Sequence, residues 1–206
     1  MSKGNEFSIY EAPKNGGTTI RIWLYYKLTK DLIRDECSTG YYTGTSEMTT
    51  YLTSNGYFNR TFESVITPIK IVIKRDPLER FVSLFNDKII KDQWLQSTSV
   101  EMLLDEYSEK ILNYNGNNAN ELLYHFCPQA NHFSNNINYF NYVFSTSEIN
   151  SSLRLFLEEL WRMKLPMLHA RNSTSWVSKE NGLTLTAKQK NLIYDFYSTD
   201  YNYGYC

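Results

Sequence analysis

The sequence predicts an α/β layered domain with a central parallel sheet and helices on both faces. Two observations favour this class: three short runs have the length and composition of strands, and stretches with helical spacing of apolar residues separate them. The expected strands cover residues 6–12, 69–74 and 139–144. The chain has no internal repeat and no linker that would divide it, so we expect a single domain over residues 1–206.

The first expected strand and helix flank a short turn. Residues 6–12 form the strand, Pro13 ends it, and helical spacing of apolar residues begins at residues 18–19. A polar segment follows, in which we expect only a short helix over 47–54. The β-branched run I-K-I-V-I-K at residues 69–74 then predicts a buried strand.

Capping signals predict where the later helices begin. Asp76 suits the N-cap of a helix, Pro77 suits its first position, and Glu79 follows three residues after the cap. Thr98 and Glu101 have the same capping-box spacing. The remaining helices are expected over residues 98–112, 152–163 and 186–197.

Length, charge and cysteine usage exclude several classes of protein. The 206 residues carry 21 basic and 22 acidic side chains, a net charge of −1, whereas a general nucleic-acid binder has a large positive excess. No window approaches the roughly 20 apolar residues of a membrane span. Three scattered cysteines without a C-x-x-C pair are typical of a reducing compartment. We therefore expect a soluble cytoplasmic protein that binds neither nucleic acid nor membrane.

The turn after the first strand has the residues of an anion-binding cradle, with the sequence P-K-N-G-G-T-T at 13–19. Glycines let backbone N–H groups turn inward, and the start of the next helix adds partial positive charge. This makes the fold P-loop-like, but the Walker pattern G-x-x-x-x-G-K-S/T is absent, because Lys14 precedes the glycines. The alternative is a plain strand–turn–helix connection with Lys14 in solvent.

A second candidate site follows the second strand. Arg75 stands at the carboxyl end of that strand, where open α/β sheets bind their ligands, and Ser83 lies two turns into the next helix. An arginine there can bind a phosphate through two N–H groups, and a serine hydroxyl can add a third hydrogen bond. The alternative is that Arg75 and Arg80 only pair with Asp76 and Glu79 on the helix surface.

These motifs carry a resemblance to a known family. The chain resembles the sulfotransferases that use 3′-phosphoadenosine 5′-phosphosulfate (PAPS), in particular the carbohydrate (Golgi-type) branch. P-K-N-G-G-T-T looks like the 5′-phosphosulfate loop of that family, and R-D-P-L-E-R-F-V-S looks like its 3′-phosphate motif. Three weaker matches extend the resemblance over about residues 8–205: H-F-C-P-Q at 125–129, Y-V-F followed by Glu148, and a tail with Tyr197, Asp200, Tyr201 and Gly204.

The resemblance implies a role for each matching residue. Lys14 would contact the bridging oxygen of the phosphosulfate, where negative charge develops. The rest of the loop would surround the 5′-phosphosulfate: Asn15, Gly16, Gly17, Thr18 and Thr19. Arg75 and Ser83 would hold the 3′-phosphate, and Arg171 lies in a late polar loop that would close over the nucleotide. The reaction requires no metal and leaves 3′-phosphoadenosine 5′-phosphate as product.

The general base is not fixed by the resemblance. Many sulfotransferases place a His or Glu between the two cofactor motifs, but residues 15–74 contain no histidine. Glu47 is the first acidic candidate, and His125, which matches a family position, is the competing one. A histidine at a helix end that only bonds to backbone is the alternative for His125. A zinc site at His125, Cys127 and His132 has no fourth ligand nearby.

The predicted function is transfer of the sulfuryl group from PAPS to a hydroxyl of a small-molecule or saccharide acceptor. Golgi members carry a membrane anchor, and we expect a short soluble form here. A small polar metabolite is therefore as good a candidate as a sugar, as in natural-product tailoring sulfotransferases, including those that act on guanidinium toxins such as saxitoxin. Two alternatives stay open: a P-loop-like nucleotide kinase or NTPase, which would need Mg²⁺, and a non-catalytic nucleotide-binding domain.

Overall fold

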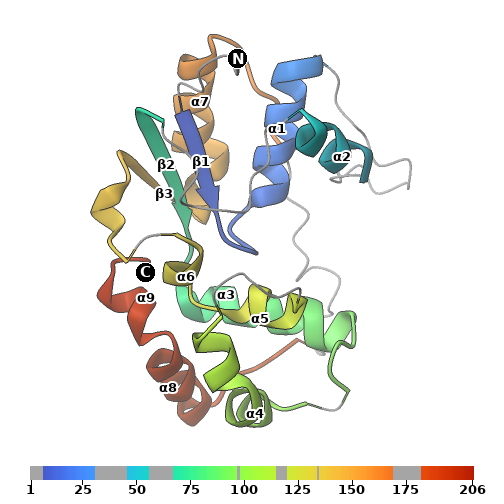
Figure 1. Cartoon of the computed structure of the whole chain (residues 1–206), viewed down its shortest axis with the longest axis vertical. Helices are drawn as coiled ribbons and strands as arrows, with labels where there is room; N and C mark the ends of the chain where they lie inside the picture. The colour runs from blue at the N-terminus through green and yellow to red at the C-terminus, as the bar shows by residue number, and fades with distance from the viewer. Residues whose placement is uncertain are drawn as a thin grey trace.

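The computed structural model of the chain describes residues 7–30, 46–55, 67–96, 98–114, 120–133, 135–168 and 182–206. Its centre is a sheet of three parallel strands in the order β1-β2-β3 (Figure 1). The strands are β1 (Phe7–Glu11), β2 (Ile69–Lys74) and β3 (Tyr142–Ser145). Ile9 pairs with Ile71, and Ile73 pairs with Phe144. The predicted parallel sheet is confirmed.

The third strand begins later than the sequence predicted. Residues 137–139 form a 3-10 turn, η3 (Ile137–Tyr139), because the Asn136 side chain accepts a hydrogen bond from the Asn138 N–H and caps the turn. The chain pairs with β2 only from Tyr142 onward. The expected start at residue 139 was therefore wrong, while the strand itself is present.

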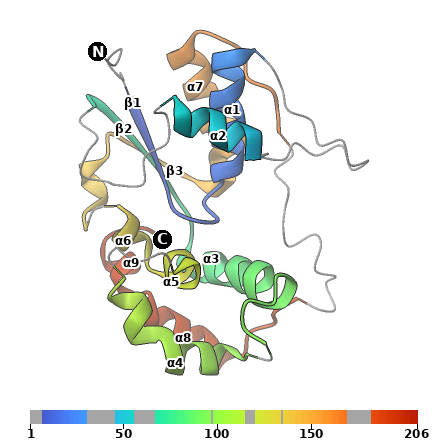
Figure 2. The same cartoon turned by 45° about the vertical axis from the view of Figure 1, so that its right-hand side comes forward.

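Alternate side chains of β2 enter two different cores. Ile71 and Ile73 face α1 (Gly17–Thr29) and α7 (Arg154–Trp161), and α2 (Ser46–Ser54) packs beside α1 (Figure 2). Val72 faces the opposite side. There it packs with residues from β1 and the turn after it, from α6 (Gln129–His132) and the segment that leads to β3, and from the C-terminal tail: Tyr10, Ala12, Ala130, Phe133, Phe140 and Tyr205. Both faces of the sheet are thus covered, as the period-2 alternation of a buried strand requires.

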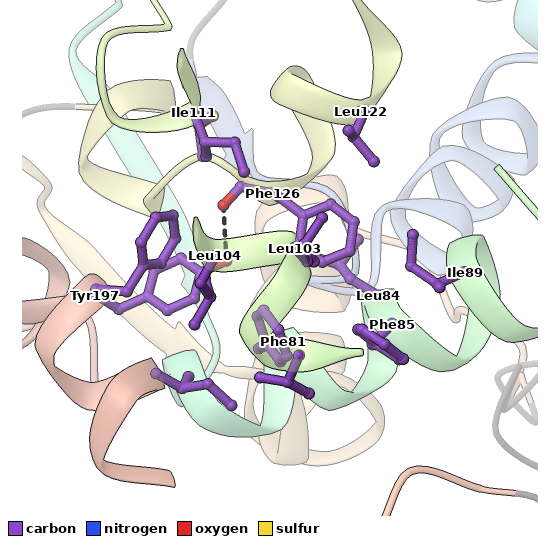
Figure 3. Packing of buried hydrophobic residues seen from close by; sticks show 14 of the residues in the cluster. Phe81, Leu84, Phe85, Ile89, Leu103, Leu104, Ile111, Leu122, Phe126 and Tyr197 are labelled. Carbon is purple, nitrogen blue, oxygen red and sulfur yellow. Dashed lines mark hydrogen bonds between the residues drawn. The ribbon is translucent and has the colours of Figure 1, made fainter. Parts of the chain in front are cut away.

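The remaining helices gather beyond the carboxyl ends of the strands (Figures 1 and 2). They are α3 (Pro77–Leu84), the π-helical segment η2 (Phe85–Lys91), α4 (Val100–Leu112), α5 (Glu121–Phe126), α8 (Ala187–Phe196) and α9 (Ser198–Asn202). Their common core is rich in aromatic residues (Figure 3). Phe81 packs edge-on against Phe126 at 5.6 Å between ring centroids, and the Tyr197 hydroxyl donates to the Phe126 carbonyl at 2.7 Å.

The predicted capping signal was correct at α3 and displaced by one residue at α4. The Asp76 side chain accepts from the Glu79 N–H at 2.9 Å at the start of α3, and Thr186 caps α8 in a reciprocal capping box. At α4, Ser99 rather than Thr98 is the N-cap. The helix expected over 152–163 begins earlier, with the π turn η5 (Ile149–Leu153) that runs into α7. A separate 3-10 turn, η4 (Thr146–Glu148), precedes it.

Within the residues that the structure describes, no helix has the length and apolar character needed to cross a membrane.

Candidate active site

The loop between β1 and α1 has a left-handed turn that favours glycine at Gly16. Lys14 and Gly16 both lie in the left-handed region, with φ of 70° and 85°. A Cβ atom on Gly16 would lie 2.1 Å from Cδ1 of Ile149, and one on Gly17 would lie 1.8 Å from Oε2 of Glu11. The N-cap of α1 is Gly16, which has no side chain to bind the amides of the first turn. The amides of that turn are therefore placed to bind an anion.

Asn15 anchors this loop to the sheet. Its side chain is fully buried, and Nδ2 donates to the carbonyl of Ile73 at 2.8 Å and to Oε1 of Gln129 at 2.6 Å. Its backbone N–H donates to the Ala12 carbonyl at 3.0 Å. These hydrogen bonds all point into the protein, so they fix the shape of the loop.

Gln129 joins the loop to the end of β2 and to the tail. Its Oε1 also accepts from the Arg75 N–H at 3.0 Å, and its Nε2 donates to the Arg75 carbonyl at 2.8 Å. The backbone N–H groups of Gln129 and Ala130 donate to the two carboxylate oxygens of Asp200, at 2.9 and 2.8 Å. Asp200 lies near the C-terminal end of the sequence. It fixes the start of α6, and with it the Gln129 side chain that bonds the phosphate loop.

Arg80 is a structural residue. Its guanidinium is fully buried and donates to three backbone carbonyls: Pro13 at 3.0 Å, Cys127 at 2.9 Å and His125 at 2.8 Å. Neither a surface ion pair nor a ligand contact accounts for these bonds. Arg80 instead ties the phosphate loop to the end of α5.

Beside this network lies a cavity of about 460 Å³ that contains both predicted 3′-phosphate residues, Arg75 and Ser83. Nε of Arg75 is buried, has no hydrogen-bond partner among the described residues, and lies 3.8 Å from the Glu79 carboxylate. The pairing of Arg75 with Glu79 that was the alternative is therefore present, but Nε still lacks a hydrogen bond among the described residues. A buried donor without a hydrogen bond is costly, which favours an anionic ligand beside Arg75. The other lining residues are Leu78, Val82, Leu183, Thr184, Leu185 and Lys190.

Lys14 makes a buried ion pair. Its Nζ lies 3.0 Å from Oδ2 of Asp87, and the two side chains are 17% and 12% exposed. Burial lowers the pKa of Lys14, and Asp87 opposes that shift. Burial raises the pKa of Asp87, but Lys14, Lys88 and Lys91 outweigh it, so the net shift of this carboxyl is downward. Each partner therefore favours the charged form of the other.

His125 has one free ring nitrogen. Its Nδ1 lies 2.8 Å from the Glu121 carbonyl, and because a carbonyl only accepts, Nδ1 carries the proton and Nε2 is left as an acceptor. Burial, assisted by Lys88 and Arg80, lowers the pKa of His125. The ring is thus neutral at pH 7, and Trp94 packs against it at 5.2 Å between centroids.

The structure brings most predicted residues to one edge of the sheet. Nη1 of Arg75 donates to the Lys14 carbonyl at 3.1 Å, which joins the two predicted cofactor motifs directly. Thr18 is exposed at the start of α1, whereas Thr19 is buried. Glu47 belongs to α2, but its side chain is outside what the structure describes.

The predicted loop residue Arg171 also lies outside the described residues. Within those residues, no three His, Cys, Asp or Glu side chains are placed to hold a metal ion.

Sequence reasoning missed several residues of this region. Leu183, Leu185 and Lys190 line the cavity although they are remote in sequence from Arg75, and no local pattern marks them. Asp87 carried a local signal: it stands four residues after Ser83, a spacing that would place both on one face if the helix continued. The structure places Ser83 in α3 and Asp87 in η2.

The parallel sheet, the glycine loop and the basic cavity at its carboxyl edge define a P-loop-like α/β protein. Comparison with protein families is more specific: the sequence model of the sulfotransferase family matches residues 1–205. The chain therefore belongs to the sulfotransferase family. No curated protein and no solved structure matches it.

Gln129→Ala tests the network that holds the loop. The change leaves the Arg75 N–H and one Asn15 donor without their acceptor, so we expect the free energy of unfolding to fall by about 3 kcal/mol in urea denaturation. Asn131→Ala is the matched control, because that amide is in the same helix but bonds the Leu112 and Tyr114 carbonyls at the surface. We expect the control to cost about 1 kcal/mol or less. Equal losses in the two variants would contradict the role assigned to Gln129.

Proposed function

We propose that this chain, as one domain over residues 1–206, transfers the sulfuryl group of PAPS to a hydroxyl of a small polar metabolite or a sugar. The observation that carries the proposal is the contact between the two anion-binding positions. Arg75 of the cavity donates to the carbonyl of Lys14 in the phosphate loop at 3.1 Å. One nucleotide with phosphates at both its 5′ and 3′ positions can therefore reach the two positions at once.

The residues present fit this donor. Arg75 Nε, which has no hydrogen bond among the described residues, and the Ser83 hydroxyl suit a 3′-phosphate, and Lys190 adds a second cation to the same cavity. The apolar wall of Leu78, Val82, Leu183 and Leu185 suits an adenine ring. The donor supplies a sulfuryl group bonded to a phosphate leaving group.

The loop residues have different roles in this proposal. The open amides at the start of α1, from Gly17 and Thr18, bind the 5′-phosphosulfate, and the Lys14 ammonium neutralises charge on the bridging oxygen. Gly16 provides the left-handed turn that precedes them. Asn15 acts indirectly, because its described hydrogen bonds position the loop.

His125 is our first candidate for the general base. Its ring is neutral at pH 7, and its Nε2 can accept a proton. Lys88 acts electrostatically on both His125 and Lys14 and pairs with Asp87, so His125 shares a charged neighbour with the Lys14–Asp87 pair. The rings of Trp94 and Tyr124 make edge-to-face contacts with its ring. Such rings pack well against a sugar or heterocycle, which supports a compact acceptor that carries a hydroxyl group. Glu47 remains the competing candidate.

Lys14→Ala tests the reaction itself. We expect transfer of labelled sulfate from PAPS, across a panel of sugars and hydroxylated metabolites, to fall by about 10²–10³-fold, because one donor to the leaving group is lost. Lys110→Ala, on the outer side of α4, should leave the rate unchanged.

Wild-type chain that binds neither PAPS nor adenosine 3′,5′-bisphosphate in a thermal-shift assay would contradict the proposal. Binding without turnover across the panel would favour a non-catalytic domain. Mg²⁺-dependent ATP turnover would favour a kinase or NTPase.

Arg75→Ala and Lys190→Ala test the 3′-phosphate position. Each should weaken binding of adenosine 3′,5′-bisphosphate by about 10–100-fold in calorimetry. Lys190→Ala should leave adenosine 5′-phosphate nearly unaffected. Arg75→Ala should weaken adenosine 5′-phosphate less than the bisphosphate, because Arg75 also bonds the Lys14 carbonyl of the phosphate loop. Lys188→Ala is the matched control, since Lys188 is exposed on the same helix and does not line the cavity. If both nucleotides lose affinity equally, the 3′-phosphate does not bind there.

The pH profile separates the two base candidates. A base works in its unprotonated form, so activity falls as the pH drops through its pKa, and for His125 that limb lies below its ordinary value of 6.5. His125→Gln should remove this limb and reduce kcat by about 10²–10⁴-fold. Glu47→Gln should leave both the acidic limb and kcat unchanged. If Glu47→Gln removes the limb and lowers kcat while His125→Gln does not, the base is Glu47.

A further inference from the structure

The Lys14–Asp87 pair is formed by two uncommon backbone conformations. Lys14 is a non-glycine residue in the left-handed region, with φ of 70°. Asp87 lies in the π-helical segment η2, and single π turns within helices occur often at functional sites. Lys14 Nζ and Asp87 Oδ2 meet at 3.0 Å, with both side chains largely buried. A surface ion pair would need neither conformation.

Asp87 is better matched to Lys14 than to its other cations. Lys88 and Lys91 lie farther from it, at 3.4 and 3.5 Å. Lys88 is closer to Asp92, at 2.8 Å, and Lys91 is half exposed. The shortest contact of the Asp87 carboxylate is thus with the lysine of the phosphate loop.

The same helix also supplies the nucleotide cavity. Ser83 near the end of α3 lines the cavity, and Asp87 follows about one turn later in η2. The continuous segment formed by α3 and η2 thus places Ser83 at the cavity and Asp87 at Lys14. In the proposed complex, this one segment would lie beside both the 3′-phosphate and the 5′-phosphosulfate of the donor.

We propose that Asp87 is a positioning residue, which holds the Lys14 ammonium charged and in place at the leaving-group oxygen. The inference rests on the proposed function and adds a residue to it. Asp87 acts through Lys14 and contacts no substrate itself.

The charges around Lys14 give the proposal a distinctive signature. Among the described residues, the charged groups that act on Lys14 include, besides Asp87, Lys88 from η2 and Arg75 from the end of β2, and both of these are cations. Burial and these two cations lower the Lys14 pKa, and Asp87 opposes them. Without Asp87, the ammonium loses its proton at lower pH. Because the ammonium is the active form, the alkaline limb of kcat/KM for PAPS moves to lower pH.

Asp87→Asn is the principal test, since asparagine keeps the shape and removes the charge. We expect kcat at pH 7 to fall by about 10–100-fold, and the alkaline limb to move down by about one pH unit or more. Carbon NMR of lysine side chains, with Lys14 assigned from the Lys14→Ala spectrum, should show the same downward shift of its titration midpoint. This readout needs no turnover.

Two further variants separate positioning from folding. Asp92→Asn is the matched control, because Asp92 contacts Lys88 and Lys91 but is not paired with Lys14. It should keep kcat within about twofold of wild type. Asp87→Glu keeps the charge on a longer side chain, so the Lys14 midpoint should stay near that of wild type, while kcat falls. Asp87→Glu also carries the test if Asp87→Asn does not fold.

An unchanged Lys14 midpoint in Asp87→Asn would overturn the inference, whatever the activity of that variant. So would full activity of both Asp87 variants. Failure of the proposed function looks different: the wild-type chain would not bind or use PAPS, while the lysine titration would still report whether Asp87 controls Lys14.

Discussion

The side-chain amide of Gln129 is the interaction on which the candidate site depends. Its oxygen accepts from the Asn15 side chain at 2.6 Å and from the Arg75 N–H, and its nitrogen donates to the Arg75 carbonyl. The backbone N–H of Gln129 donates to the Asp200 carboxylate. Each hydrogen bond contributes only about 1 kcal/mol, but a buried donor left without an acceptor costs 1–3 kcal/mol. The network is therefore stable as a whole and sensitive to the loss of any member.

This constraint explains a division between the two arginines of the R-D-P-L-E-R motif. Arg80 is fully buried and its three hydrogen bonds all go to backbone carbonyls, with the buried charge of Asp200 nearby. Arg75 lines a cavity, and its Nε pairs with Glu79 but has no hydrogen bond among the described residues. The structural arginine is committed to the fold, so among the described residues we propose Lys14, Arg75 and Lys190 as the cations that face the ligand. A chain with a net charge of −1 can present a strongly basic site in this way.

Local signals predicted much of the fold. The β-branched run of β2, the glycine turn before α1 and the Asp76 cap of α3 all act between neighbouring residues, and the structure has each of them. The start of β3 was misplaced because a side chain of Asn136 stabilises a turn there. The glycine loop and Arg75 were predicted for the same reason, as strand ends are local features. The partners of Arg80 and the cavity wall at Lys190 depend on long-range packing, which no short sequence pattern encodes.

A crystal structure of the chain with adenosine 3′,5′-bisphosphate tests the central claim most directly, since the claim is that one nucleotide spans the phosphate loop and the Arg75 cavity. We predict its 3′-phosphate within hydrogen-bond distance of Arg75 Nε and Ser83 Oγ, and its 5′-phosphate on the first-turn amides of α1 beside Lys14. A nucleotide bound at another face of the sheet, or one whose 3′-phosphate contacts neither Arg75 nor Ser83, would contradict it.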